Sequence, residues 1–164
     1  MKIAIDSRSL MNPPAGVANY LIAAVNQIAR SHSSCLIYLL VNRDLDREAF
    51  ERIEKSKNVA IIKKPAKYFG RIGIIWYICK LFFILKEIKP DFFWTPANVL
   101  PPIMPKDIKT IVTVQDFVSK KHADTMMFTD RLYYSIFFNR SIQSIFLAKD
   151  IFINNAIFTG YGCH

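Results

Sequence analysis

The first candidate for chemistry is a glycine that opens a predicted helix shortly after a buried strand. The segment from Asp6 to Tyr20 reads DSRSLMNPPAGVANY, so two prolines stiffen a loop that ends at Gly16. The N–H groups at a helix start have no partner within the helix and carry partial positive charge, so they can bind a phosphate that no side chain blocks. The segment matches neither G-x-G-x-x-G nor G-K-[ST]. On local grounds Gly16 is therefore either a phosphate-facing residue or an ordinary turn residue.

Two further groups of polar residues follow predicted strands. Thr95, Pro96 and Asn98 lie in a loop rich in proline, and Gln115 and Asp116 follow a β-branched run. A carboxylate can accept a hydrogen bond from a substrate hydroxyl, whereas an amide can donate or accept one but does not exchange a proton near neutral pH. Each group is either a part of a binding site or a set of residues that fixes its own loop.

The histidines and cysteines, residue types that can bind metals or form disulfides, are scattered along the chain. They show no H-x-x-x-H or C-x-x-C spacing and comprise His32, His122, His164, Cys35, Cys79 and Cys163. We therefore expect no metal site, no cofactor and no disulfide framework. Three widely spaced cysteines suit the reducing cytoplasm.

Composition describes a folded chain with excess positive charge. Its 164 residues suffice for one domain with a core, and 52% hydrophobic against 21% charged residues excludes a disordered chain. Lysine and arginine number 22 against 13 acidic residues, a net charge of +9 that favours phosphates or anionic lipid as partners. The basic residues are dispersed and form no nucleic-acid-binding motif, so we expect no nucleic-acid partner.

Hydrophobic periodicity predicts strands that alternate with helices. Strands are expected at residues 3–6, 36–41, 59–62, 91–94, 109–114 and 150–153. Helices are expected at 17–29, after a cap at Asp44 or Asp46, at 71–87 before Pro90, and at 130–147. The buried face of the first helix is expected to carry Val17, Leu21, Ala24, Val25 and Ile28.

This alternation predicts an α/β fold, a Rossmann-like parallel sheet with helices on both faces. With the strand order 3-2-1-4-5-6, a ligand crevice would lie beyond the carboxyl ends of strands one and four, where the order reverses. The loops at 7–16, 95–102 and 115–121 would then meet there.

Four segments together resemble glycosyltransferase family 4. AGVANY is similar to the family's G-[IV]-x-[RN]-Y helix entry, and IKPDFFWTPANVLP to its [LI]-x-P-D-[IV]-x-[HW]-x-P...LP segment. KTIVTVQDF resembles its K-x-[IV]-x-T-[IV]-H-D-[LF] strand and loop, and NRSIQSIFLAKDIFINNAIFT its R-x-[IA]...A-D-x-I-I-x-V-S-x-[FY]-[ST] stretch. Their order and spacing match from residue 1 to about residue 159.

The resemblance implies the acceptor-side, N-terminal half of a retaining GT-B glycosyltransferase. The parent activity would transfer a hexose from a nucleotide-sugar donor to a glycan or lipid-linked acceptor, in surface-polysaccharide biosynthesis. Gly16 would face the donor phosphates, Thr95, Pro96 and Asn98 would lie at the acceptor pocket, and Gln115 and Asp116 would be catalytic. Gln115 departs from the family pattern, which has histidine at this position, whereas Asp116 matches it.

The resemblance also implies a division of the chain. Residues 1–153 would form the Rossmann-like domain, and residues 154–164 would begin the path toward a second domain that carries most of the donor site, including an E-x7-E motif. No such motif occurs in these residues. We therefore expect the 164-residue chain by itself to transfer no sugar.

Two alternatives remain open at the level of sequence. The chain could be a non-catalytic remnant, or a nucleotide-binding or membrane-surface α/β module. Residues 72–85 read IGIIWYICKLFFIL, which suits either a helix buried on most sides or one at a membrane surface, and the lysines and arginine at 63, 64, 67 and 71 could contact anionic lipid. The expected location is the cytoplasm, with peripheral attachment to the inner face of the cytoplasmic membrane as the alternative.

Overall fold

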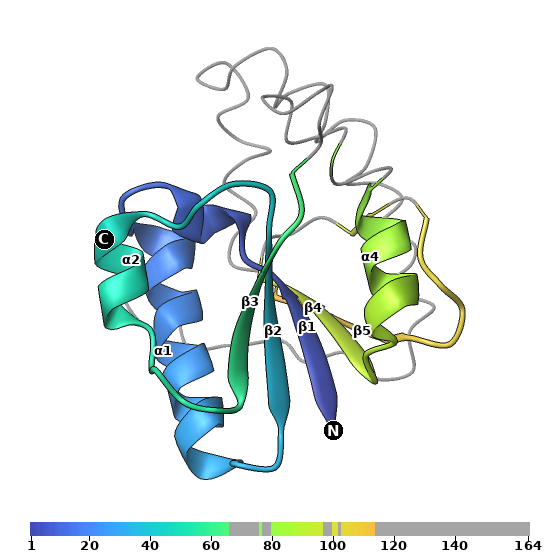
Figure 1. The fold of residues 1–164 in the computed structure, drawn as a ribbon, viewed down its shortest axis with the longest axis horizontal. Helices are drawn as coiled ribbons and strands as arrows, with labels where there is room; N and C mark the ends of the chain where they lie inside the picture. The colour runs from blue at the N-terminus through green and yellow to red at the C-terminus, as the bar shows by residue number, and fades with distance from the viewer. Residues whose placement is uncertain (66–75, 77–79, 97–99, 102, 114–164) are drawn as a thin grey trace, which may run out of the picture.

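The computed structural model describes residues 1–65, 76, 80–96, 100–101 and 103–113. Within them, five parallel strands form one sheet in the order β3-β2-β1-β4-β5 (Figure 1). This is the expected α/β, Rossmann-like arrangement, and for these five strands the order agrees with the 3-2-1-4-5-6 order from which the ligand crevice was inferred. The strands are β1 (Lys2–Asp6), β2 (Leu36–Val41), β3 (Val59–Lys63), β4 (Phe92–Thr95) and β5 (Lys109–Val112).

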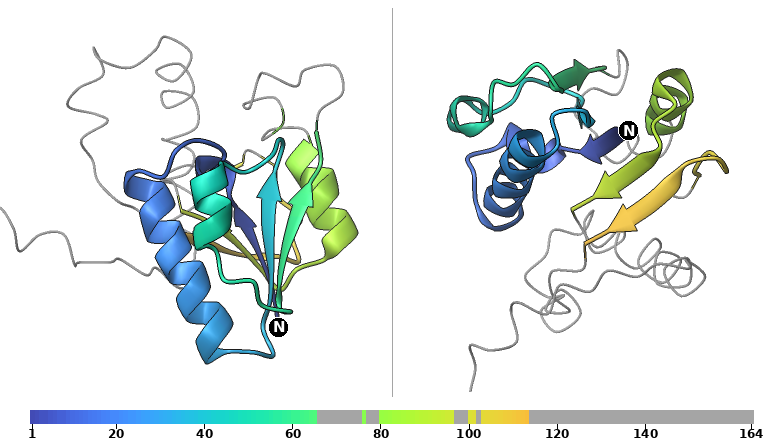
Figure 2. Two further views of the ribbon diagram at one scale, coloured as in Figure 1. Left: turned by 60° about the vertical axis from the view of Figure 1, so that its left-hand side comes forward. Right: turned by 90° about the horizontal axis from the view of Figure 1, so that it is seen from below.

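Helices cover both faces of the sheet. α1 (Gly16–Ser31) and α2 (Arg47–Arg52) lie on one face and α4 (Leu81–Ile88) on the other (Figure 2). A short 3-10 helix, η1 (Arg8–Met11), follows β1 directly. The predicted helix at 130–147 and the sixth strand at 150–153 lie outside the described residues.

Two apolar clusters, one on each face, hold the layers together. On β1, Ile3 and Ile5 pack toward α1, while Ala4 between them packs toward α4. Successive side chains of a strand point to opposite faces, so a strand covered on both sides must be apolar throughout. β2 shows the same pattern, because residues 37 and 39–41 are all buried.

The buried face of α1 differs in part from the predicted one. Leu21 and Val25 are buried as expected, and Ala24 and Ile28 are half-buried and pack against the core. Val17 is only half-buried, and the prediction left out the buried residues Ala18, Ile22 and Ala29. The prediction for Val17 was therefore wrong, since the neighbouring Ala18 takes the buried position.

Local signals fix the ends of the other helices. Asp46, not Asp44, caps α2: its side chain accepts hydrogen bonds from the backbone N–H groups of Glu48 and Ala49, at 2.9 and 3.4 Å. α4 ends as Lys89 turns into the left-handed region, with φ of 49°, immediately before Pro90. The predicted start of that helix near residue 71 lies outside the described residues.

Candidate functional site at the carboxyl edge of the sheet

The carboxyl ends of β1, β4 and β5 meet at one edge of the sheet. Ile5 pairs with Trp94, which places Asp6 and Thr95 at the next level of adjacent strands. The N–H of Thr113, just past β5, donates to the carbonyl of Thr95 at 3.0 Å. These ends are the place at which a doubly wound sheet binds its ligand.

Gly16 begins α1 above this edge and leaves its backbone open. It is exposed and has φ of +31°, a backbone conformation that residues with a side chain rarely adopt. A Cβ placed there would meet no other atom within 4 Å. The cap residue, Ala15, offers no side-chain hydrogen bond, and the first turn contains no acidic residue. The helix start is therefore unblocked and carries no competing anion.

An aromatic contact connects this helix start to the strand ends. Tyr20, one turn into α1, meets Trp94 of β4 edge to face, with ring centroids 6.1 Å apart. The indole N–H of Trp94 in turn donates to the hydroxyl of Thr113 at 2.9 Å, and both groups are buried. Tyr20 therefore packs against β4 and holds the first turns of α1 over that strand.

An ion pair that the sequence analysis did not single out lies at the end of β1. The guanidinium of Arg8 donates from Nε and Nη2 to the two carboxylate oxygens of Asp6, at 2.9 and 2.8 Å. The Asp6 side chain is only 5% exposed, whereas Arg8 is 22% exposed and also lies over the ring of Trp76. Such a forked pair fixes direction as well as charge, so it sets the course of the chain into η1. The D-x-R spacing was the available signal.

Two buried polar atoms at this end of the sheet have no hydrogen-bond partner in the described part of the chain. They are the hydroxyl oxygen of Ser9, in η1 after β1, and the amide oxygen of Asn42, directly after β2. Asn42 is 8% exposed. Unpaired buried acceptors cost about 1–3 kcal/mol each and call for a donor from water or a ligand. The burial of these two residues could not be predicted from the sequence, because it depends on how the two loops pack.

The predicted acceptor-side residues are only partly described. Thr95 is fully buried at the end of β4, and Pro96 after it is also buried. Asn98, Gln115 and Asp116 lie outside the described residues. The structure thus brings the ends of β1 and β4 and the start of α1 together, as the sequence predicts. Thr95 and Pro96 are buried at that edge of the sheet.

Trp76 bears on the two alternatives left open for residues 72–85, a buried helix or a membrane surface. It is fully buried, as the first alternative expects, and its indole N–H donates to the carbonyl of Lys64 at 2.6 Å. Lys63 and Lys64 are paired with Asp44 and Glu87, at 2.7 and 3.0 Å. Their charges are therefore balanced within the chain. The other members of that basic cluster, at 67 and 71, lie outside the described residues.

Neither a metal cluster nor a membrane span occurs in the described part of the chain. Among those residues, no three side chains of histidine, cysteine, aspartate or glutamate gather as metal ligands would. No helix there has both the length and the apolar character needed to cross a bilayer. The described residues at the carboxyl edge contribute backbone N–H groups, amides, hydroxyls and the ion pair of Asp6 with Arg8.

Comparisons with models of protein families, with curated proteins and with solved structures returned no match to the chain. The resemblance to glycosyltransferase family 4 therefore rests on the four sequence segments; the described parts of the first three lie in α1, β4 and β5.

Proposed function

We propose that the chain forms the acceptor-side half of a retaining, nucleotide-sugar-dependent glycosyltransferase. The observation that carries the proposal is the meeting of the β1, β4 and β5 ends below the open start of α1. Three of the segments that resemble the family supply these elements: AGVANY opens α1, FFWTP forms β4 and the residues after it, and KTIV forms β5. The parent reaction moves a hexose from a nucleotide sugar to a glycan or lipid-linked acceptor.

In this proposal the edge contributes hydrogen-bonding groups. The N–H groups of the first turn of α1 contact the donor diphosphate, since Gly16 permits close approach and positive charge is present there. Gln115 and Asp116, which follow β5 in the sequence, orient the acceptor hydroxyl and the transferred sugar. A glutamine holds a sugar hydroxyl by hydrogen bonds at any physiological pH, so position 115 itself does not titrate during the reaction.

The phosphate contact is tested by titrating the full chain with uridine diphosphate and, separately, with uridine, and recording amide NMR shifts. At about 10 mM ligand, millimolar dissociation constants are detectable. We expect uridine diphosphate, and not uridine, to shift the amides of residues 16–18. Gly16→Asp should abolish those shifts by adding a carboxylate, and aspartate tolerates a positive φ better than most residues.

The matched control is Gln27→Glu, which makes the same change in charge at an exposed position farther along α1. It should leave the shifts intact. Equal shifts with uridine, or shifts that survive Gly16→Asp, would contradict a phosphate site at this helix start.

Sugar transfer by the 164-residue chain alone should not exceed the uncatalysed background. Stabilising the charge on the leaving diphosphate is usually the largest catalytic contribution, and loss of a single donor costs about 10²–10³ in rate. In the family these donors come mostly from the second domain. Release of nucleotide diphosphate from a nucleotide sugar, with a lipid-linked acceptor present, measures the rate. Repeated turnover by the purified chain would overturn the expectation.

A further inference from the structure

The edge strand β3 has one backbone side that no described strand pairs with. It lies at one end of the sheet and pairs only with β2. The carbonyl of Asn58 accepts from Ile37, and the N–H of Lys64 donates to Val41. Because backbone direction alternates along a strand, residues 58, 60, 62 and 64 turn toward β2. The N–H and C=O groups of Val59, Ile61 and Lys63 therefore point outward.

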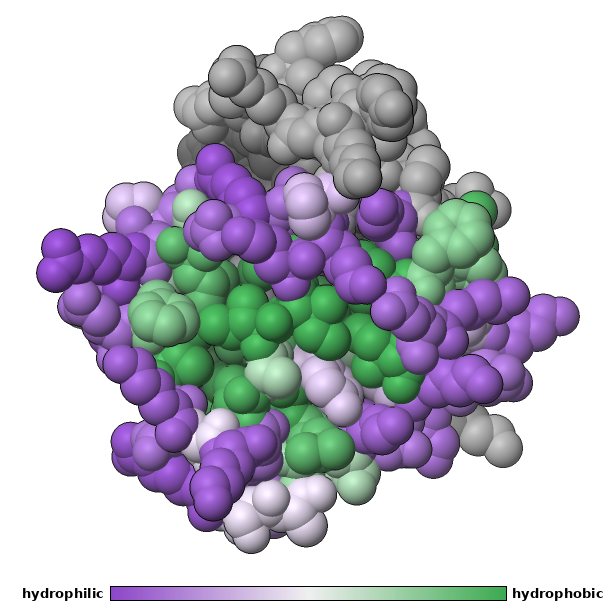
Figure 3. Space-filling model, in the orientation of Figure 1, coloured by the Kyte–Doolittle hydropathy of each residue, from purple (hydrophilic) through white to green (hydrophobic). Residues whose placement is uncertain are grey.

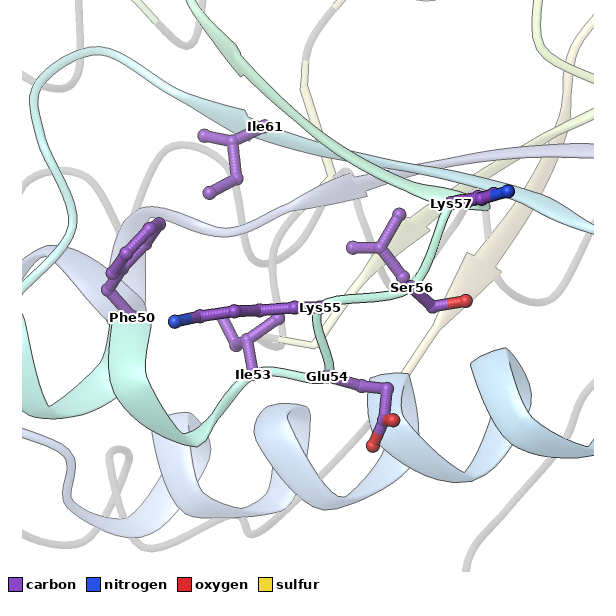
Figure 4. Close-up of a pocket in the computed structure, with 8 residues that line it drawn as sticks. Phe50, Ile53, Glu54, Lys55, Ser56, Lys57 and Ile61 are labelled. Atoms are coloured by element: carbon purple, nitrogen blue, oxygen red, sulfur yellow. The ribbon is translucent and has the colours of Figure 1, made fainter.

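A groove runs beside this free edge, between α2 and β3. It has a volume of about 390 Å³ and an apolar floor that includes Phe50, Ile53, Val59 and Ile61. Phe50 is 49% exposed and Ile61 is 40% exposed, which is unusual for large apolar side chains. Figure 4 shows Phe50 on α2 and Ile61 on β3 pointing toward the same space, with the side chain of Lys55 extending below it toward Phe50. The groove can therefore hold an apolar side chain from outside the chain.

Hydrophilic side chains surround this apolar surface. In the space-filling view, with β3 facing the viewer, apolar surface occupies the centre of the face and hydrophilic residues border it (Figure 3). Figure 4 shows Glu54 turned away toward α1, where its carboxylate binds Arg30 at 2.7 Å. Lys55 and Lys57 line the groove and have no carboxylate partner among the described residues. The ammonium of Lys55 lies 5.6 Å from the ring centroid of Phe50. The groove is therefore apolar inside and positively charged at its rim.

We propose that this edge binds an extended segment of a partner protein that carries apolar and acidic residues on one face, at every second position. The segment adds as a strand beside β3, with backbone hydrogen bonds to Val59 and Ile61. Its apolar side chains enter the groove against Phe50, and its carboxylates meet Lys55 and Lys57. The proposal is independent of sugar transfer, since it uses none of the carboxyl-edge residues.

Charge selects this occupant over a second copy of the chain. Two copies paired in parallel would bring Lys55 and Lys57 of one edge beside those of the other, and like charges across paired strands are destabilising. Two antiparallel copies would bring them toward Lys63 of the other edge, whose carboxylate partner Asp44 is already engaged. Lysines at a sheet edge are a common means of preventing such self-pairing. The lysines thus oppose a basic copy and favour an acidic strand. A lipid bilayer offers phosphates but no strand to satisfy the outward backbone groups.

The test uses the full chain and a fluorescent peptide in which valine and glutamate occupy every second position, with threonine at the positions between them. An otherwise identical peptide contains lysine for glutamate. We expect the glutamate peptide to bind at low salt, to weaken as salt is raised, and to protect the amides of Val59, Ile61 and Lys63 from hydrogen exchange. Reversing the rim with Lys55→Glu and Lys57→Glu should weaken binding about tenfold or more.

A pair of variants at one position separates strand addition from loose contact. Ile61→Pro removes an outward N–H without removing a bond to β2, so binding should fall about tenfold while the fold persists. Ile61→Thr keeps the N–H and should bind within about threefold of the parent chain. Equal binding of both peptides or failure of the glutamate peptide to bind would overturn the proposal. The proposal would also be overturned if the chain formed a dimer that Ile61→Pro abolishes. It would likewise be overturned if the chain bound anionic vesicles through Lys55 and Lys57.

Discussion

Buried polar side chains hold several loops of this protein in place by hydrogen bonds. Asn58, at the entrance to β3, is an example, since its amide nitrogen lies 3.1–3.3 Å from the carbonyl oxygens of Ala29, His32 and Cys35. Its own oxygen accepts from the hydroxyl of Ser56. One amide thereby ties the end of α1 to the starts of β2 and β3.

Replacing Asn58 with aspartate should destabilise the protein strongly. The change turns a donor that serves three carbonyls into a buried carboxylate facing them, at a cost of about 3 kcal/mol near pH 7. Protonation restores a donor, so the carboxyl pKa is higher in the folded variant than in the unfolded one. The deficit should therefore shrink as the pH falls toward about 4. Urea unfolding at several pH values measures it, with Asn12→Asp, an exposed loop position, as the control. An equal deficit at both positions would contradict the role of Asn58.

The buried thiol of Cys35 gives a second pH-dependent prediction. Burial raises its pKa, Asp91 adds to the rise, and the positive amino terminus opposes it. Because the folded pKa lies above the unfolded value of about 8.5, its contribution to stability is complete below that pH and is lost as the pH rises through the folded pKa. The difference in unfolding free energy between the parent chain and Cys35→Ala should be constant below about pH 8 and fall above it. A difference that stays flat to about pH 10 would contradict this assignment.

At the scale of elements, the ends of helices show where sequence reasoning succeeds. Pro90 marks the end of α4 because a proline restricts the residue before it, and an aspartate predicts the start of α2 because its oxygen can cap N–H groups. The choice between Asp44 and Asp46 depended on tertiary structure, since Asp44 is taken up by Lys63. The ion pair of Asp6 with Arg8 also depended on it, because two charges in a D-x-R spacing meet only when the chain turns into η1.

Lys89 is the position in these elements where a substitution should stabilise. It has φ of 49° and ψ of 62° at the end of α4, a conformation that glycine adopts without a steric cost. Lys89→Gly should raise the free energy of unfolding by about 0.5–1 kcal/mol. Lys86→Gly, inside the same helix, should lower it by about 1 kcal/mol. Thermal and urea unfolding of the two variants check the signs, and a loss in both would show that Lys89 carries no backbone strain.

At the scale of the whole molecule, the alternating order of strands and helices was enough to predict the parallel sheet, whereas its strand order was taken as a condition. Parallel strands require crossovers, and the handedness of these crossovers limits the arrangements open to β1 to β5. The candidate site was predictable only as a place, the carboxyl edge. The buried oxygens of Ser9 and Asn42 arise from contacts between loops distant in sequence, which periodicity does not contain.

Trp76 tests the role of the α4 face in holding the molecule together. Its ring is fully buried in the cluster that includes Ala4, Leu40 and Phe93, and its N–H binds the carbonyl of Lys64. Trp76→Ala should cost about 3–5 kcal/mol through the cavity it leaves. Trp76→Phe keeps much of the ring but loses the hydrogen bond, and should cost about 1–2 kcal/mol. An interfacial tryptophan would behave in the opposite way, with unchanged urea unfolding and weaker attachment to vesicles.

The central position of β1 sets the order in which the nascent chain can be completed. β1 pairs on one side with β2 and on the other with β4, whose residues emerge from the ribosome much later. The amino-terminal strands can assemble early with α1 and α2, but Ala4 and Leu40 on the opposite face wait for Trp76, Leu81 and Phe93. At about 5–20 residues per second, this face stays uncovered for seconds. For that interval the unfinished sheet is a substrate for chaperones that bind apolar strands.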